Sequence, residues 1–150
     1  MLRLLLMNHQ PHKKMTTTSK IVFPKKYKPS FILKLPYPPT INSYYGTTRQ
    51  GQRFIGAKGT AYRKEVVEIL RGIPEASGTL AEDKRLQVWV EMHVPDRRKR
   101  DVDNILKCLL DSLTHANVWD DDGQIDDIRV LRAPVIKGGY VRVHVAVKND

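Results

Sequence analysis

The stretch RRKRDVDNILK, residues 97–107, sets two aspartates beside a run of positive charge. Asp101 and Asp103 are two residues apart, so on extended chain their carboxylates point the same way, about 7 Å apart along the backbone. Lys107 follows Asp103 by four residues, one helical turn, so we expect its ammonium on the same face. The run before them consists of four cationic side chains: Arg97, Arg98, Lys99 and Arg100. This spacing favours two carboxylates that converge on one cation, with a lysine within reach of what they hold.

A second acidic cluster, WDDDGQIDD, spans residues 119–127 and places five aspartates in eight positions. The apolar stripe before it predicts a helix over residues 103–115, about 20 Å long. Because the far end of such a helix cannot reach back alone, the chain must return alongside it. We expect a strand that starts near Asp122 and runs back past the start of the helix, bringing Asp122 close to Asp101 and Asp103.

Clustered carboxylates raise one another's pKa and are costly to hold together unless a cation neutralises them. Mg²⁺ suits such a cluster, because it binds one or two carboxylates, keeps several waters and takes substrate phosphate as a further ligand. It also activates water and stabilises charge on a phosphoryl group. The cations at 97–100 would attract the phosphates of a nucleic-acid backbone. These residue types therefore favour hydrolysis of a phosphodiester.

Each part of this pattern also has a purely structural interpretation. Asp103 would serve as a helix N-cap, and Asp103 with Lys107 would form an ordinary surface pair. The basic run would then be a solvated patch and the acidic stretch an acidic loop. A calcium-binding EF-hand loop is excluded, because Gly123 in the sixth position puts a valine first. His93 and His144 lie in alternating segments, so we interpret them as sheet side chains rather than metal ligands.

Length and charge restrict the class of protein. The chain has 150 residues, enough for one domain that buries about 68–70% of its unfolded surface. Residues 1–100 carry 20 Lys and Arg against 7 Asp and Glu, a net +13, whereas residues 101–150 carry 6 against 9, a net −3. The basic part indicates a polyanionic partner such as nucleic acid. The single cysteine, Cys108, cannot form an internal disulfide, which favours the cytoplasm. The apolar run MLRLLLM is too short to span a bilayer, so we expect no membrane role.

Hydrophobic patterning predicts the elements that must position these residues. Residues 1–30 show no periodicity and are interpreted as a flexible basic N-terminal extension, which leaves the domain at 31–150. The elements predicted within it are a strand over 31–36, a surface loop over 40–54, a helix over 57–72, a strand over 84–94, the helix over 103–115, and strands over 128–135 and 140–147 joined as a β-hairpin by the turn at 137–139. The order β-α-β-α-β-β predicts an α/β fold of the α+β type: a single domain with a mixed β-sheet and two main helices.

Several stretches taken together resemble the RusA family of Holliday junction resolvases, small endodeoxyribonucleases of bacteria and their prophages. The likeness runs from about residue 31 to residue 147 and includes LPYPPTINSYY, AKGTAYR, MHVPDRRKRDVDNILKCLLDSLTHANVWDDDGQIDD and VIKGGYVRVHV. The specific part is the combination of DRRKRDVDN, a lysine four residues after the second aspartate, and W-x-D-D-x-Q.

The resemblance implies a RusA-like fold and a Mg²⁺-dependent homodimer, with Mn²⁺ as a substitute ion. It also implies binding to four-way junction DNA and symmetric nicking of two opposed strands, in DNA recombination and repair. The essential side chains of the family fall on four residues: Asp101, Asp103, Lys107 and Asp122. Three consecutive aspartates at 120–122 leave the last assignment open by one position, and alignment on Trp119 and Gln124 selects Asp122. Residues 1–30 depart from the family pattern.

Two other functions remain open from the sequence. The first is a noncatalytic basic DNA-binding module, in which the aspartates only cap a helix and keep the surface solvated. Its DNA binding would be sensitive to salt, and it would give no metal-dependent cleavage product. A metal-dependent nuclease that acts on another branched or flapped nucleic acid would share the site but not the substrate.

Overall fold

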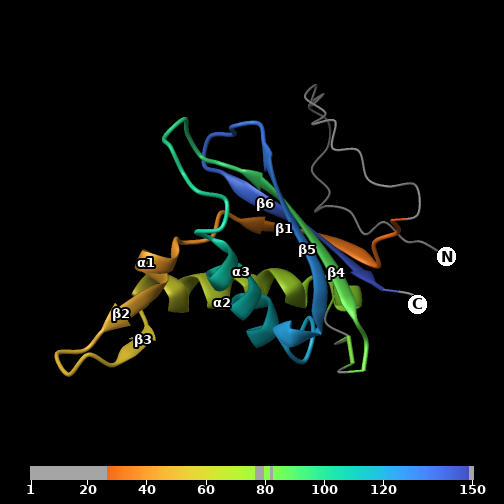
Figure 1. The fold of residues 1–150 in the computed structure, drawn as a ribbon, viewed down its shortest axis with the longest axis horizontal. Helices are drawn as coiled ribbons and strands as arrows, with labels where there is room; N and C mark the ends of the chain where they lie inside the picture. The colour runs from red at the N-terminus through yellow and green to blue at the C-terminus, as the bar shows by residue number, and fades with distance from the viewer. Residues whose placement is uncertain (1–26, 77–79, 82, 149–150) are drawn as a thin grey trace.

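The computed structural model describes residues 27–76, 80–81 and 83–148. The elements in chain order are β1 (Phe31–Pro36), α1 (Ile41–Tyr44), β2 (Tyr45–Thr47), β3 (Arg53–Ile55), α2 (Ala57–Arg71), the 3₁₀ turn η1 (Pro74–Ala76), β4 (Leu86–His93), α3 (Leu106–His115), the 3₁₀ turn η2 (Asp122–Gln124), β5 (Ile125–Ala133) and β6 (Tyr140–Val147). The long elements follow the predicted order β-α-β-α-β-β, and both main helices lie on the same side of the sheet (Figure 1).

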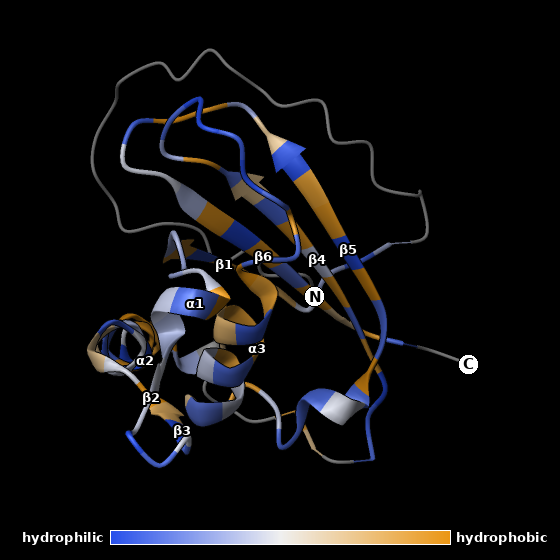
Figure 2. Ribbon diagram, turned by 60° about the vertical axis from the view of Figure 1, so that its left-hand side comes forward, coloured by the Kyte–Doolittle hydropathy of each residue, from blue (hydrophilic) through white to orange (hydrophobic). Residues whose placement is uncertain are grey.

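The main sheet has four strands in the order β1-β6-β4-β5. β5 runs parallel to β4, whereas β6 is antiparallel to both β1 and β4, so the sheet is mixed as predicted. Hydrophobic and hydrophilic residues alternate along these strands (Figure 2), which gives the sheet one apolar face for the helices. The alternation in the sequence therefore identified the faces of the strands correctly.

The core lies between the apolar face of the sheet and the stripes of α2 and α3. Each helix contributes buried residues at helical spacing, such as Tyr62 and Val66 from α2 and Leu109 and Leu113 from α3. The sheet contributes a buried layer whose members are paired across strands: Leu33, Leu35, Val88, Val90, Met92, Val141, Val143 and Val145. Cys108 is fully buried in this core, so it packs as a small apolar side chain.

The opposite face of the sheet carries polar and aromatic residues. His144 Nε2 lies 2.8 Å from Glu91 Oε2 across the β4–β6 pair, and the ring of His93 stacks on that of Tyr140. Both histidines are therefore sheet side chains, as predicted. Within the described residues no group of three His, Cys, Asp or Glu side chains is arranged to hold a metal ion on this face or elsewhere.

Most of the predicted N-terminal extension lies outside the described residues. Its last residues are described, and they contact the sheet: the Tyr27 ring stacks on Trp89 with centroids 4.6 Å apart, and Ser30 N donates to Val145 O at 2.7 Å. The boundary at residue 30 stays a prediction, although the contacts of the fold begin by Tyr27.

The predicted hairpin between the last two strands is wrong. β5 and β6 are not neighbours, because β4 lies between them and pairs with both. The turn glycines are present, with positive φ at Gly138 and Gly139. However, the connection crosses the end of β4, where Ile136 N donates to Val94 O at 3.0 Å. Alternation and a glycine turn predict two strands, but they do not determine which strands pair.

Other parts of the fold also differ from the prediction, and β5 covers Ile125–Ala133 rather than residues 128–135. The predicted loop at 40–54 contains α1 and the antiparallel hairpin of β2 and β3, which projects from the body of the molecule (Figure 1). The second helix begins at Leu106 rather than at residue 103, because residues 102–105 form a turn. No described helix has the length and apolar character needed to cross a membrane.

Candidate functional site

The connection between β4 and α3 carries the predicted basic run and the first two aspartates. It is held in shape by Asp96, which sequence reasoning did not select. Asp96 accepts a hydrogen bond from Arg98 N at 2.9 Å and forms a two-pronged ion pair with the Arg100 guanidinium. These contacts hold the pKa of the Asp96 carboxyl well below its usual range, and the hydrogen bond from Arg100 has the largest effect. From the far end of β5, Arg132 donates to Arg100 O at 2.6 Å, so the loop is fixed to the sheet.

The four predicted DNA-binding cations are therefore not equivalent. The Arg100 side chain is 20% exposed and already paired with Asp96, so it stabilises the loop. Arg97, Arg98 and Lys99 are exposed. The basic loop and Arg132 line a pocket at this end of the sheet. Three of the four cations are thus available to a phosphate backbone.

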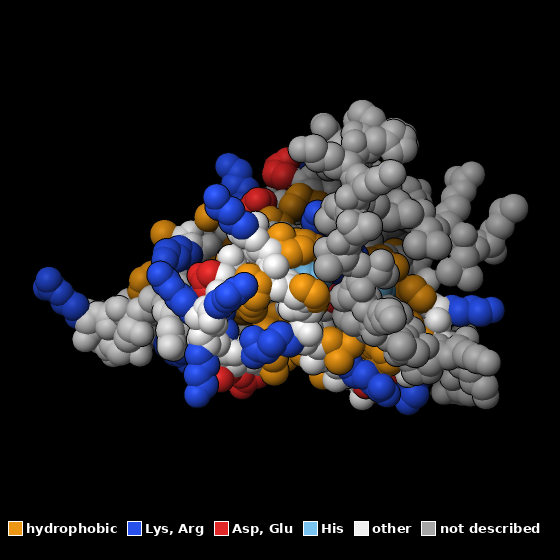
Figure 3. Space-filling view, turned by 90° about the horizontal axis from the view of Figure 1, so that it is seen from above, with side chains coloured by type: hydrophobic (Ala, Val, Ile, Leu, Met, Phe, Trp, Pro, Cys, Tyr) orange, Lys and Arg blue, Asp and Glu red, His pale blue; other side chains and the backbone are white. Residues whose placement is uncertain are grey.

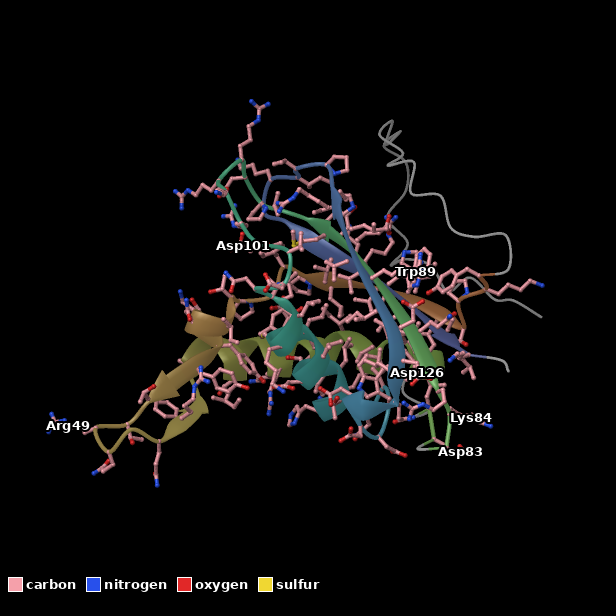
Figure 4. The ribbon with its side chains drawn as sticks, viewed as in Figure 1. Arg49, Asp83, Lys84, Trp89, Asp101 and Asp126 are labelled. Atoms are coloured by element: carbon pink, nitrogen blue, oxygen red, sulfur yellow. The ribbon has the colours of Figure 1, made fainter. Side chains whose placement is uncertain are left out.

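Asp101 and Asp103 lie on the same connection, just before α3, and both are exposed (Figure 4 labels Asp101). Asp103 is not the helix N-cap that was predicted: the cap position is Ile105, without a side-chain cap, and Asp103 contributes only its backbone carbonyl, to Leu106 N at 3.1 Å. Within the described part of the chain, neither carboxylate has a hydrogen bond or an ion pair. Two carboxylates thus remain uncompensated beside a cationic loop.

Lys107 lies in the first turn of α3 but does not pair with Asp103. Its Nζ donates to Asp111 Oδ1 at 2.7 Å, and the other oxygen of Asp111 accepts from the Tyr45 hydroxyl at 3.4 Å. The bond to Asp111 raises the pKa of Lys107, and the charges of Asp111, Tyr45 and Asp122 act in the same direction. The structure therefore brings Lys107 together with Asp111 and Tyr45, and places the charge of Asp122 near enough to act on it.

Asp111 is a site neighbour that the sequence prediction missed. Its side chain is 15% exposed and comes from the middle of α3. The available signal was its spacing of four residues after Lys107, which places opposite charges on adjacent turns of a helix.

The aspartates of the acidic turn after α3 differ in their contacts. Asp121 Oδ1 accepts from Gly123 N at 2.6 Å and caps η2, so this carboxylate has a structural role. The carboxylate of Asp122 is half-buried and, among the described residues, has neither a hydrogen bond nor an ion pair. This difference agrees with the alignment that selected Asp122 over Asp121.

Gln124 holds this turn in place. Its side chain is 2% exposed, and its Oε1 accepts from the backbone N–H groups of Asp120 and Asp121 at 2.9 and 3.0 Å. Its Nε2 donates to three carbonyl oxygens of the segment before β4: Leu80 at 3.2 Å, Ala81 at 2.7 Å and Lys84 at 3.0 Å. Trp119, fully buried, donates from Nε1 to Thr114 Oγ1 at 2.7 Å. The W-x-D-D-x-Q pattern therefore encodes a fixed turn as well as an acid.

The three predicted metal ligands are not gathered at one point. Asp101 and Asp103 precede α3, whereas Asp122 follows it, and a helix of 10 residues is about 15 Å long. Over the described residues no three candidate ligands are arranged around a common centre. The chain does return along the sheet as expected, but the residue at the far end of β5 that reaches the loop is Arg132. A shared metal site of all three aspartates stays a prediction.

Comparison with known proteins links this arrangement to one family. The sequence model described as "Endodeoxyribonuclease RusA" matches residues 36–148. The "Crossover junction endodeoxyribonuclease rusA" of Enterobacteria phage HK97 is 46% identical over 111 residues, which cover 74% of this chain and 89% of the relative. The proteins of that name from Enterobacteria phage 82 and Escherichia coli K12 are 40% and 39% identical over 116 residues, which cover 77% of this chain and 93% of each relative. The predicted resemblance is confirmed, and the chain belongs to the RusA endodeoxyribonuclease family.

Proposed function

We propose that this chain is a structure-selective endodeoxyribonuclease that resolves four-way DNA junctions by paired, symmetric nicks. The observation that carries the proposal is the family match, which spans residues 36–148 and so includes every predicted site residue. The relatives that share 39–46% of their residues with it are named crossover junction endodeoxyribonucleases. The chemistry of the β4–α3 connection, with unpaired carboxylates beside exposed cations, supports the same reaction.

Asp101 and Asp103 have the donor chemistry that Mg²⁺ prefers, because both are exposed carboxylates without a protein cation to displace. Asp122, whose carboxylate is also unpaired within the described chain, is the third ligand that we propose, although the described structure does not group it with the other two. When bound, the ion supplies an activated water and positive charge for the phosphoryl group, and Mn²⁺ would substitute for it.

The remaining residues bind and orient the DNA. Arg97, Arg98 and Lys99 would bind backbone phosphates next to the cleaved bond. The ammonium of Lys107 would stabilise the negative charge that develops on the phosphate. Asp111 holds that ammonium in a fixed direction and keeps it protonated.

We further propose that the protein acts as a homodimer in the cytoplasm. A two-fold axis would relate two sites in the same way that it relates the opposed strands of a four-way junction. Sedimentation equilibrium should then give twice the 17.2 kDa of one chain.

The decisive experiment compares a four-way junction, a flap and a linear duplex as substrates, each with and without Mg²⁺. We expect paired nicks in the junction alone, and only with the metal. Asp103→Asn should fold and bind the junction but lose about 100-fold or more of the cleavage rate. Asp120→Asn is the matched control, because Asp120 is also exposed but is not assigned to the site. Cleavage by Asp103→Asn at nearly the wild-type rate would reject the site, and flap cleavage alone would reject the substrate.

A further inference from the structure

The β2–β3 hairpin projects from the body of the molecule and carries an exposed aromatic side chain. Phe54 is 49% exposed, the largest exposed fraction among the large apolar side chains of the described residues. Arg49 lies at the tip of the hairpin, away from the sheet (Figure 4). Two strands of three residues have little stability of their own, so the hairpin depends on the contacts at its base.

The charge around this hairpin has one sign. No Asp or Glu occurs before Glu65, so every charged side chain from Tyr27 to Lys64 is a cation. Arg49, Arg53 and Lys58 are exposed. In Figure 3 lysine and arginine side chains are spread over the end of the molecule from which the hairpin projects. An isolated exposed phenyl ring needs no explanation, but one within an acid-free basic arm fits a nucleic acid.

The two faces of the hairpin differ. Phe54 pairs across the strands with Gly46, and its ring lies over that glycine, which has no side chain to displace it. The opposite face is occupied, because the Arg53 guanidinium lies 4.7 Å from the centre of the Tyr45 ring. One face of the Phe54 ring is therefore supported by backbone, and the other is open to a planar partner.

The base of the hairpin is connected to the candidate site. Tyr45, the first residue of β2, donates from its hydroxyl to Asp111, the partner of Lys107. Just before the hairpin, Ile41 N donates to Asn104 O at 2.8 Å, next to Asp103. The hairpin thus has a defined position relative to the residues proposed to cut DNA.

We infer that the hairpin is a DNA-reading arm, in which Phe54 stacks on a base at the branch point of the junction and Arg49 contacts a phosphate. This inference rests on the proposed function. Bases inside a duplex are covered on both faces, whereas an opened branch point interrupts the stack and exposes a base face. Stacking of an aromatic side chain on such a base changes affinity about 5- to 150-fold. The arm therefore favours junctions over duplexes, whereas the cations of the β4–α3 loop bind both.

The test uses the full chain with Asp103→Asn, so that binding is measured without cleavage. Junctions that carry 2-aminopurine at the branch point report unstacking of that base as a rise in fluorescence. We expect the parent to cause this rise, and Phe54→Ala to abolish it and to weaken junction binding about 10-fold or more, with duplex affinity unchanged. Phe54→Trp should restore both signals. Ile128→Ala is the matched control, since Ile128 is a 40% exposed apolar side chain on β5.

Three results would overturn the inference: the same fluorescence rise with Phe54→Ala, an equal loss of affinity for junction and duplex, or the same effect from Ile128→Ala. Unfolding curves of each variant separate lost contacts from lost folding, and the exposure of Phe54 predicts little change in stability. Failure of the proposed function is recognised separately, because the unmodified chain with Mg²⁺ would then leave the junction uncut. Binding and fluorescence still test the arm in that case.

Discussion

The buried amide of Gln124 provides a sharp test of how the acidic turn is held. It accepts from two backbone N–H groups of the turn and donates to three carbonyl oxygens of the segment before β4. Gln124→Glu keeps the size of the side chain and the accepting oxygen. It replaces the donating NH₂ group by an oxygen that faces three carbonyl oxygens.

The expected loss follows from these contacts. Each hydrogen bond contributes about 0.5–1.5 kcal/mol, and the NH₂ group has two hydrogens to share among the three carbonyl oxygens, so loss of its donated bonds costs about 2 kcal/mol. A carboxylate that is 2% exposed adds a desolvation penalty, so we expect a total of about 3–5 kcal/mol at pH 8, a large part of the stability of a small domain. Burial raises the pKa of the new carboxyl above its unfolded value of about 4.3. The desolvation penalty is therefore absent below that pH and grows as the pH rises towards the folded pKa.

Urea unfolding at pH 5 and pH 8, followed by tryptophan fluorescence, measures both effects. Gln50→Glu introduces the same charge at an exposed position and should change the free energy of unfolding by no more than about 0.5 kcal/mol. The reasoning is refuted if Gln124→Glu is as stable as the wild type at pH 8, or if its loss equals that of the control.

Three other predictions address separate parts of the molecule. Asp111→Asn removes the hydrogen bond that raises the pKa of Lys107. The alkaline limb of the pH–cleavage profile should therefore move to lower pH. An unchanged alkaline limb would contradict a role for the protonated lysine. Gly59→Ala should lower the free energy of unfolding in urea by about 1–3 kcal/mol, because the added methyl group would lie 2.6 Å from the Tyr44 ring. This loss is expected although alanine favours helices. A gain in stability would show that the Tyr44 ring moves aside. Burial raises the pKa of Cys108 to about 12, so a thiol reagent at pH 8 should label it in urea but not in the native protein, and rapid native labelling would refute its burial.

Much of the fold could be predicted because its periodicities are strong. β4 and β6 alternate along eight residues, and α2 repeats its apolar positions over 15 residues. The β2 and β3 strands have three residues each, too few to show a period, so their segment was predicted to be a loop. The order of the strands in the sheet could not be predicted either. β4 lies between β5 and β6, and this long-range pairing leaves no local pattern in the sequence.

The candidate site shows the same division between local and long-range information. Asp101 and Asp103 could be selected because carboxylates beside a cationic run are unusual. Asp96 and Asp121, in the same region, have structural roles instead. The sequence could not distinguish them from Asp101 and Asp103, because their roles depend on the hydrogen bonds that they accept in the folded structure. The partner of Lys107 was missed for a similar reason, since two carboxylates lie four residues from it and only the turn at 102–105 favours Asp111.

The order of strands in the sheet also determines when the protein can fold during synthesis. β6 leaves the ribosome after the other described strands, yet it lies inside the sheet and pairs with both β1 and β4. Phe31 of β1 pairs with Val145 of β6, so more than a hundred further residues must be synthesised before β1 can pair with its neighbouring strand. Because such non-local pairing is slow and leaves strand edges exposed, β1 and β4 emerge as unpaired edges. The sheet can therefore be completed only after β6 has been synthesised.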